Sequence, residues 1–450
     1  MEGFDHSLSD HLPVRGVIAA PVQTGAGKAA IRIDPLIYAK PQVRDDVASL
    51  WRNVYRNKEL SEEEKWTEAK ETVGAYLLEK SRPEYGEDSE PAIAYKAVAD
   101  HHEGGVDTGP TEEWHRQLEL LKTQLQRCKK EAARSRRGAY LATLNKEKSS
   151  KTFFHHYKAP RTTSGIPAVH VTPDWDHPEE RLGTDEGPEV ILEQFTRYYS
   201  WLFEPEKSIR PEKYLKLLEQ TKIPKHINKM LDADLTRSEI SEAIDSLAKG
   251  KATGPDGLGA EFYKTFEHII KDDLLHMLEG AEDTGTLPET TRSGDVIVLY
   301  KKGDPKEVRN YRPIHLLNAD YKIYAKIMGF RMRKALDYFV SKEQLGFVPG
   351  RNISEASHLM QLVQAYLDET DEEGLLIALD WEKAFDRVSW DFLHNAYKAL
   401  GFGAKFRHRA RLMANPDCPP TRTVKIDGER GKKFHMHSGV PQGCPFSPLA

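Results

Sequence analysis

The stretch GLLIALDWEKAFDRVSW, residues 374–390, changes character at a single acidic residue. The apolar run 375–379 that precedes Asp380 is too short for a typical helix and too apolar for the exposed edge of a sheet. We therefore expect a buried central strand that ends at Asp380. Apolar residues then recur at helical spacing from Phe385 until Gly401, so Asp380 is predicted to lie where a strand gives way to a helix.

A carboxylate at such a junction has two explanations. It can cap the helix that follows, because a side-chain oxygen accepts hydrogen bonds from the first backbone N–H groups of a helix. It can also be a rigidly held oxygen ligand for Mg²⁺ that contacts substrate phosphates at the same time. The stretch around Asp380 leaves both explanations open.

Composition limits the class of protein. The chain has 450 residues, of which 39% are hydrophobic, so it has room for two or three domains and for a core in at least one of them. The N-terminus lacks a secretory leader, no apolar run approaches membrane-spanning length, and the three cysteines form no CxxC pair. We expect a nuclear or cytoplasmic protein that is not secreted and has no membrane partner.

Charge is distributed unevenly although the net charge is only -5. Residues 113–161 contain 13 Lys and Arg against 4 Asp and Glu, a local balance of 13 - 4 = +9. Near the end of this segment, bases alternate with the aromatic run 153–157. A solvated helix followed by a loop would explain this pattern, and so would a nucleic-acid contact in which the aromatic rings stack on unpaired bases.

The C-terminal half shows regular local patterns. Thr236 and Glu239 form a predicted capping box for a helix that ends near Gly250, and a second helix is expected over 260–279. A short strand, DVIVLY, then leads into the basic hairpin KKGDP. Helices alternating with short strands predict an α+β domain.

Five segments of this half resemble the reverse transcriptases of non-LTR (LINE-type) retrotransposons. LDWEKAFDRVSW resembles their motif A, and SGVPQGCPFSPLA resembles their motif B. KGKATGPDGLGAEFYKTF, VIVLYKKGDPKEVRNYRPIHLLNADYKIYAKIMGFRM and EQLGFVPGRNISEA resemble the opening of the polymerase fingers, the fingers hairpin with its helix, and the template-side segment. The resemblance implies right-hand polymerase fingers and a partial, truncated palm, preceded by a helical, partly disordered connecting region.

The resemblance also implies roles for individual residues. Asp380 would bind the catalytic Mg²⁺ (or Mn²⁺), whereas Asp386 is not a ligand in the family pattern and would serve the local structure. Phe385 would be the steric gate that favours deoxynucleotides. The incoming triphosphate would be held by Lys301 and Arg312, and the nascent base pair would be contacted by Gln442 and Gly443. The template segment would comprise Gln344, Gly346, Phe347, Gly350 and Arg351.

Each of these residues has a simpler explanation from its local pattern alone. Phe385 fits the buried face of a helix, the basic residues fit a charged surface hairpin, and the Pro- and Gly-containing segment around Gln442 fits an ordinary turn.

The N-terminus carries a second resemblance. LSDHLPV looks like the last motif of the endonuclease/exonuclease/phosphatase domain, with Asp10 and His11 as the residual nuclease pair. The other residues of such a nuclease do not occur, so no cleavage is expected. The predicted organisation is a residual nuclease end (1–43), an acidic helix and linker (44–111), a basic helical connecting segment (112–161), a linker with helices (162–234) and a reverse transcriptase domain (235–450).

One departure from the family leads to two functional hypotheses. No Tyr-x-Asp-Asp motif, which supplies the second carboxylate cluster in the family, occurs in the sequence, and no thumb follows motif B. The first hypothesis is an RNA-directed DNA polymerase that uses an RNA template, a DNA primer and deoxynucleoside triphosphates, truncated and inactive as this chain. The alternative is a non-catalytic nucleic-acid-binding remnant. Nothing in the sequence indicates an oligomeric state.

Overall fold

The computed structural model describes residues 33–81, 166, 168–205 and 212–450. The predicted nuclease pair Asp10 and His11, and the basic connecting segment 112–161, lie outside the described residues. Among the helices that are described, none is both long enough and apolar enough to cross a membrane.

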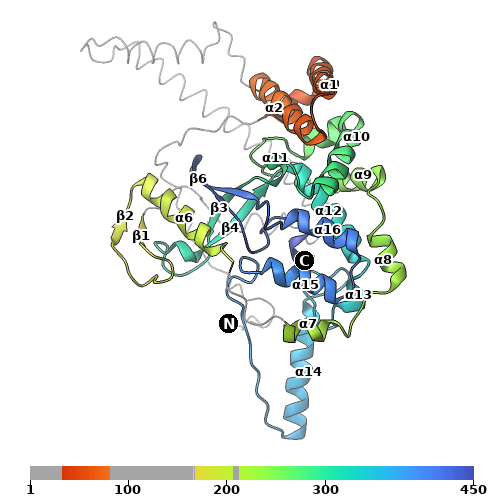
Figure 1. Cartoon of the computed structure of the whole chain (residues 1–450). Coiled ribbons are helices and arrows are strands. Elements are labelled where there is room, and N and C mark those ends of the chain that lie inside the picture. Colours follow the sequence, from red (N-terminus) through yellow and green to blue (C-terminus); the bar gives the residue numbers. More distant parts are fainter. Residues whose placement is uncertain (1–32, 82–165, 167, 206–211) are drawn as a thin grey trace, which may run out of the picture. The chain divides into compact units, whose positions relative to one another are not determined.

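A four-stranded mixed sheet lies at the centre of the described fold, with the strand order β4-β3-β5-β6 (Figure 1). The predicted strand DVIVLY is confirmed as β3 (Gly294–Tyr300), and it forms an antiparallel hairpin with β4 (Tyr311–Leu317) in which Leu299 faces Arg312. On its other side β3 pairs in parallel with β5 (Thr421–Ile426), which in turn forms an antiparallel hairpin with β6 (Glu429–His435). The expected mixture of helices and a sheet is therefore present.

Helices form most of the remaining structure, and their ends follow local chemistry. The predicted capping box is confirmed, because the N–H of Glu239 donates to Thr236 Oγ1 at 3.2 Å and the N–H of Thr236 donates to Glu239 Oε2 at 3.1 Å. Helix α9 (Arg237–Asp245) ends earlier than predicted. Helix α10 (Ala260–Thr284) continues further than predicted, until Gly285 adopts a left-handed conformation with φ of 77°.

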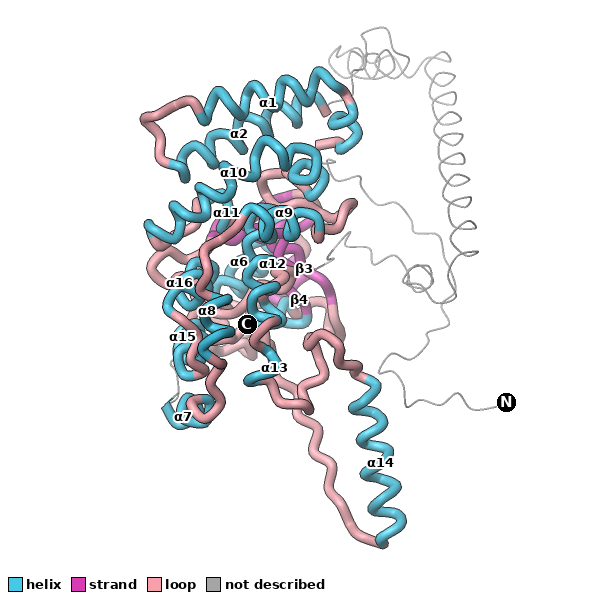
Figure 2. The backbone as a smooth tube through the Cα atoms, turned by 90° about the vertical axis from the view of Figure 1, so that its right-hand side faces the viewer, coloured by secondary structure: helices cyan, strands magenta, loops and turns pink. Residues whose placement is uncertain are grey.

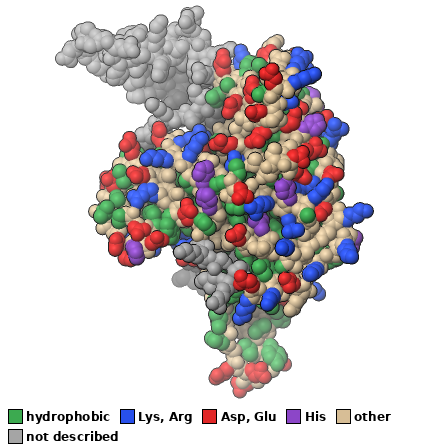
Figure 3. Space-filling model, in the orientation of Figure 1, with side chains coloured by type: hydrophobic (Ala, Val, Ile, Leu, Met, Phe, Trp, Pro, Cys, Tyr) green, Lys and Arg blue, Asp and Glu red, His purple; other side chains and the backbone are tan. Residues whose placement is uncertain are grey.

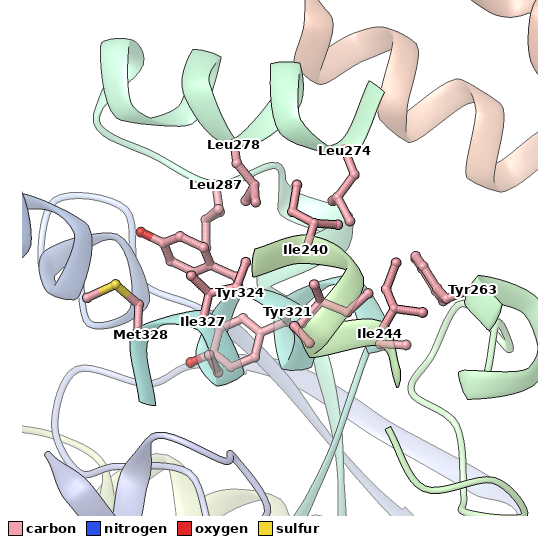
Figure 4. Packing of buried hydrophobic residues seen from close by; sticks show 14 of the residues in the cluster. Ile240, Ile244, Tyr263, Leu274, Leu278, Leu287, Tyr321, Tyr324, Ile327 and Met328 are labelled. Carbon is pink, nitrogen blue, oxygen red and sulfur yellow. The ribbon is translucent and has the colours of Figure 1, made fainter. Parts of the chain in front are cut away.

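The larger hydrophobic core is formed where α9 and α10 pack with α12 (Ala319–Arg333), as Figure 4 shows. Its central side chains include Ile240, Ile244, Leu274, Leu278, Tyr321 and Tyr324, all of which are fully buried. Helices α1 (Pro41–Tyr55) and α2 (Glu62–Lys80) contribute Trp51 and Trp66 to the same core. These N-terminal helices therefore share one hydrophobic core with α9, α10 and α12.

A buried ionic contact fixes α2 against that core. Lys70 Nζ lies 2.8 Å from Asp256 Oδ2 and 2.7 Å from Asp320 Oδ2, and Trp66 Nε1 donates to the same oxygen of Asp320 at 3.0 Å. Because all three charged groups are shielded from water, loss of the lysine would leave two buried carboxylates without their cation.

A second hydrophobic cluster covers the other side of the sheet. Helix α6 (Pro188–Leu202) places Phe195 and Tyr199 against Val296 of β3 and Phe434 of β6. A small two-stranded sheet, β1 (Val169–Val171) with β2 (Gly183–Asp185), lies next to it.

The other helices of the described residues are η2 (Pro35–Ala39), α7 (Glu212–Leu218), α8 (Lys225–Leu231), α11 (Glu289–Arg292), η3 (Val308–Asn310), α13 (Leu336–Phe339), α14 (Ser354–Thr370), α15 (Trp390–Ala399), α16 (Ala404–Met413) and η4 (Ser447–Leu449).

The expectation of a buried strand at 375–379 is wrong. This segment is extended but pairs with none of the described strands, and it runs back along α14 as a projecting hairpin (Figures 1 and 2). Leu375 is 86% exposed and Trp381 is 79% exposed, and no side chain of α14 is buried. Hydrophobic side chains are visible on this projection in Figure 3, with acidic side chains at its tip.

The physical reason for the error is that apolar composition records a preference for burial but not the presence of a neighbouring strand. The helix expected directly after Asp380 also begins later, because α15 begins at Trp390, where Ser389 Oγ accepts the N–H of Phe392 at 3.3 Å.

Candidate functional site

The turn that follows Asp380 docks on the loop that contains Gln442. Val440 N–H donates to the carbonyl oxygen of Phe385, and Gly439 N–H donates to that of Val388, each at 2.7 Å. Trp390 Nε1 donates to the carbonyl oxygen of Gly439, also at 2.7 Å. Gly439 has a φ of 79°, and a side chain there would collide with the backbone carbonyl of Asp386, so this close approach requires glycine.

Asp386 lies inside this junction and is 2% exposed. Its two carboxylate oxygens accept hydrogen bonds from Gln442 Nε2, at 2.9 Å for Oδ1 and 3.1 Å for Oδ2. Burial raises the pKa of Asp386 to about 6, although the Gln442 hydrogen bonds and the charges of Lys383 and Arg312 act in the opposite direction. The sequence-based assignment of Asp386 to the local structure thus corresponds to a specific contact with Gln442.

Strand β4 holds the same loop from the other side. The N–H of His315 donates to the carbonyl oxygen of Gln442 at 2.8 Å. Gly443 has a φ of 120°, and a Cβ atom there would lie 2.7 Å from the carbonyl oxygen of His315. Gln442 and Gly443 therefore lie between the end of motif A and the strand that carries Arg312.

Lys383 joins the turn after Asp380 to the β3–β4 hairpin, and the sequence reasoning missed it. Its Nζ donates to the carbonyl oxygens of Arg309 at 2.9 Å and Tyr311 at 3.4 Å, and it lies 5.7 Å from the centre of the Tyr198 ring on α6. Burial lowers the pKa of Lys383, Asp386 opposes that effect, and the positive charge of Lys301 adds to it. The sequence feature that could have identified Lys383 is that it is the one basic residue between Asp380 and Phe385.

The two basic residues assigned to the triphosphate lie on the β3–β4 hairpin. Lys301 follows β3, and its N–H donates to the carbonyl oxygen of Asn310 at 2.9 Å. Arg312 lies on β4, and its positive charge acts to lower the pKa of Asp386, against the effect of burial. Both side chains are exposed, so they are accessible to an anionic ligand.

The template-side segment reaches the same region through one aromatic contact. Phe347 is 66% exposed, has a φ of 61°, and lies edge-on to Phe385 with 6.2 Å between the ring centres. The guanidinium of Arg351 donates to the carbonyl oxygens of Gln344 at 2.7 Å, Val340 at 3.4 Å and Ser341. Arg351 therefore stabilises the loop to which it belongs by hydrogen bonds to the backbone of residues 340–344.

Gln344 and the two glycines contribute to the shape of that loop. Gln344 Nε2 donates to the carbonyl oxygen of Gly346 at 3.1 Å, and Gly350 has a φ of 81°.

Asp380 is exposed, and within the described part of the chain it makes no hydrogen bond or ion pair with the other candidate residues. Across the described ranges, the group of at least three potential metal ligands is His170, Asp304 and Glu307, in which Glu307 is already paired with Arg181 and Arg309. Among the described residues, no group of three or more potential ligands includes Asp380.

Relationships to known proteins agree with the resemblance carried by the motifs. Residues 300–450 match the family model for reverse transcriptase (RNA-dependent DNA polymerase). The "Transposon TX1 uncharacterized 149 kDa protein" of Xenopus laevis is 32% identical over 264 residues, which cover 58% of this chain and 20% of the relative.

Two further relatives carry names of R2 retrotransposable elements. A retrovirus-related Pol polyprotein from the type-1 retrotransposable element R2 of Popillia japonica is 26% identical, covering 48% of this chain and 29% of the relative. A retrovirus-related Pol polyprotein from the type-2 retrotransposable element R2DM of Drosophila melanogaster is 22% identical, covering 48% of this chain and 19% of the relative. The chain thus spans less than a third of the length of each of these relatives.

Proposed function

The chain carries a reverse transcriptase domain related to those of non-LTR retrotransposons, and we propose that this domain binds a deoxynucleoside triphosphate between the β3–β4 hairpin and the turn after Asp380. The observation that carries the proposal is that candidate residues from separate segments of the chain lie around one buried carboxyl group. Arg312, Phe385 and Gln442 come from three separate segments, and all three border on Asp386 or its immediate neighbours.

The chemistry of these residues suits the ligand. The planar guanidinium of Arg312 can bind phosphate oxygens with two hydrogen bonds, and the ammonium of Lys301 can add a mobile positive charge. The half-buried ring of Phe385 offers a bulky surface that would exclude a 2′-hydroxyl group. The RNA template and the DNA primer are the nucleic-acid partners that the proposed reaction requires.

Divalent metal ions assist nucleotidyl transfer in polymerases by stabilising the attacking and leaving oxygens. We assign the motif A residue Asp380 to that ion, with Mg²⁺ or Mn²⁺ as candidates. Because no Tyr-x-Asp-Asp motif occurs in the sequence, and because no group of three or more potential ligands among the described residues includes Asp380, we propose that the chain binds nucleotide and nucleic acid but does not extend a primer by itself. The same two observations also support the second candidate function, a non-catalytic nucleic-acid-binding protein.

A primer-extension assay tests the proposal of inactivity. The full 450-residue chain is incubated with an annealed RNA template and DNA primer, deoxynucleoside triphosphates and Mg²⁺, and in parallel with Mn²⁺. We expect no extended product and no difference between the wild type and Asp380→Asn. Templated synthesis by the wild type that Asp380→Asn abolishes would contradict the proposal and identify an active polymerase.

A further inference from the structure

We propose that Asp386 is a positioning residue that fixes the orientation of the Gln442 side-chain amide. This inference rests on the function proposed above, in which Gln442 contacts the nucleotide. Asp386 is too deeply buried to touch a ligand itself. It would therefore act through Gln442, which is half-buried.

The orientation follows from the donors and acceptors involved. An ionised carboxylate only accepts hydrogen bonds, so the NH₂ group of Gln442, and not its oxygen, must face Asp386. Both carboxylate oxygens lie within 3.1 Å of Nε2. The amide oxygen Oε1 is consequently the group that Gln442 can offer to a hydrogen-bond donor on a bound nucleotide.

The backbone around the pair explains why the contact is precise. The hydrogen bonds of Val440 with Phe385 and of Gly439 with Val388 lie on either side of Asp386, and the carbonyl oxygen of Gln442 is held by His315. These main-chain contacts do not involve the Asp386 side chain. A substitution of that side chain should therefore release the amide while the two segments stay docked.

Charged and titratable groups face Asp386 from each neighbouring element. Lys383 lies on the same turn and Arg312 lies on β4, and both stabilise the ionised carboxylate. On α6, burial raises the pKa of the Tyr198 and Tyr199 hydroxyls, and the negative charge of Asp386 adds to that rise. The two cations favour the ionised form of Asp386, which is the form that holds the amide NH₂ group.

A double-mutant cycle on nucleotide binding tests the positioning role. The dissociation constant of the full chain for dUTP with Mg²⁺ is measured for the wild type, Asp386→Ala, Gln442→Ala and the double variant. We expect each single substitution to weaken binding roughly 5-fold, the size of one hydrogen bond, and the double variant to bind no worse than Gln442→Ala. Single effects that multiply in the double variant would overturn the proposal. Asp391→Ala, an exposed acid on α15, is the matched control and should bind like the wild type.

A second measurement separates this inference from the proposed function. With ¹⁵N-labelled glutamine, the Gln442 side-chain amide is identified as the signal lost in Gln442→Ala. We expect slow exchange of its protons with water in the wild type and fast exchange in Asp386→Ala. An amide that already exchanges freely in the wild type would overturn the inference even if dUTP binds. A held amide without dUTP binding would support the inference and contradict the function proposed for the site.

Discussion

At Asp386, burial and hydrogen bonding act in opposite directions on the same carboxyl group. Burial dominates, so the pKa rises from 3.8 to about 6. A carboxyl whose pKa is raised by folding stabilises the folded state most below its unfolded pKa, and that contribution is lost as the pH rises through the folded pKa. Between pH 4 and pH 7, the ionisation of Asp386 should therefore reduce the free energy of unfolding.

Asp386→Asn should reveal this loss because asparagine stays neutral throughout. We expect the difference in unfolding free energy between the variant and the wild type to move in favour of the variant by up to roughly 3 kcal/mol from pH 4 to pH 7, at about 1.4 kcal/mol per pKa unit. Urea denaturation at four pH values measures it, with Asp391→Asn as the control. A difference that does not change with pH would show that Asp386 has an ordinary pKa.

The sequence could nominate single candidate residues but could not indicate which residues they contact. Arg312, Phe385 and Gln442 could be selected because each lies in a recognisable segment. The contact between Asp386 and Gln442 joins positions 56 residues apart, and the role of Lys383 depends on carbonyl groups more than 70 residues upstream. Local spacing carries no information about such contacts, so neither could be derived from the sequence pattern.

Among the elements, those with a strong local pattern were predicted well. The capping box and apolar spacing identified α9, and the apolar run of β3 already had a hairpin partner nearby in the sequence. The run 375–379 has the same composition as a buried strand but no adjacent strand in the described fold. Strand formation depends on a partner strand, whereas the first residue and the buried face of a capped amphipathic helix can be predicted from its own residues.

Hydrogen exchange should distinguish these two apolar segments. We expect backbone amides of residues 375–380 to exchange almost as fast as those of an unstructured peptide, because no strand protects them. Amides of residues 295–300 should exchange slowly, because β3 pairs with β4 along its whole length and residues 294–297 also pair with β5. Mass spectrometry of peptic fragments from the full chain measures both at once. Slow exchange of 375–380 would mean that this segment pairs in solution.

At the scale of the whole described fold, a well-packed frame supports the candidate site. The N-terminal helices, α10 and α12 share one core, which is reinforced by Lys70 and by a hydrogen bond of 2.8 Å from Trp51 Nε1 to Asp273 Oδ2. This frame positions the β3–β4 hairpin and the Gln442 loop. The mixture of helices and sheet and the reverse transcriptase domain could be predicted from the motifs, but the exposure of Asp380 and of the apolar run before it could not.

The central claim is that Arg312, Phe385 and Gln442 form a deoxynucleotide pocket, and a comparison of dUTP with UTP tests it most directly because the two ligands differ only in the 2′-hydroxyl. Equilibrium binding to the full chain is measured with Mg²⁺ for the wild type, Arg312→Ala and Phe385→Ala. We expect the wild type to bind dUTP more tightly than UTP. Arg312→Ala should weaken the binding of both nucleotides about 10-fold or more, because charge-assisted hydrogen bonds are lost. Phe385→Ala should remove most of the preference for dUTP. Equal affinity for the two nucleotides that neither substitution changes would contradict the account.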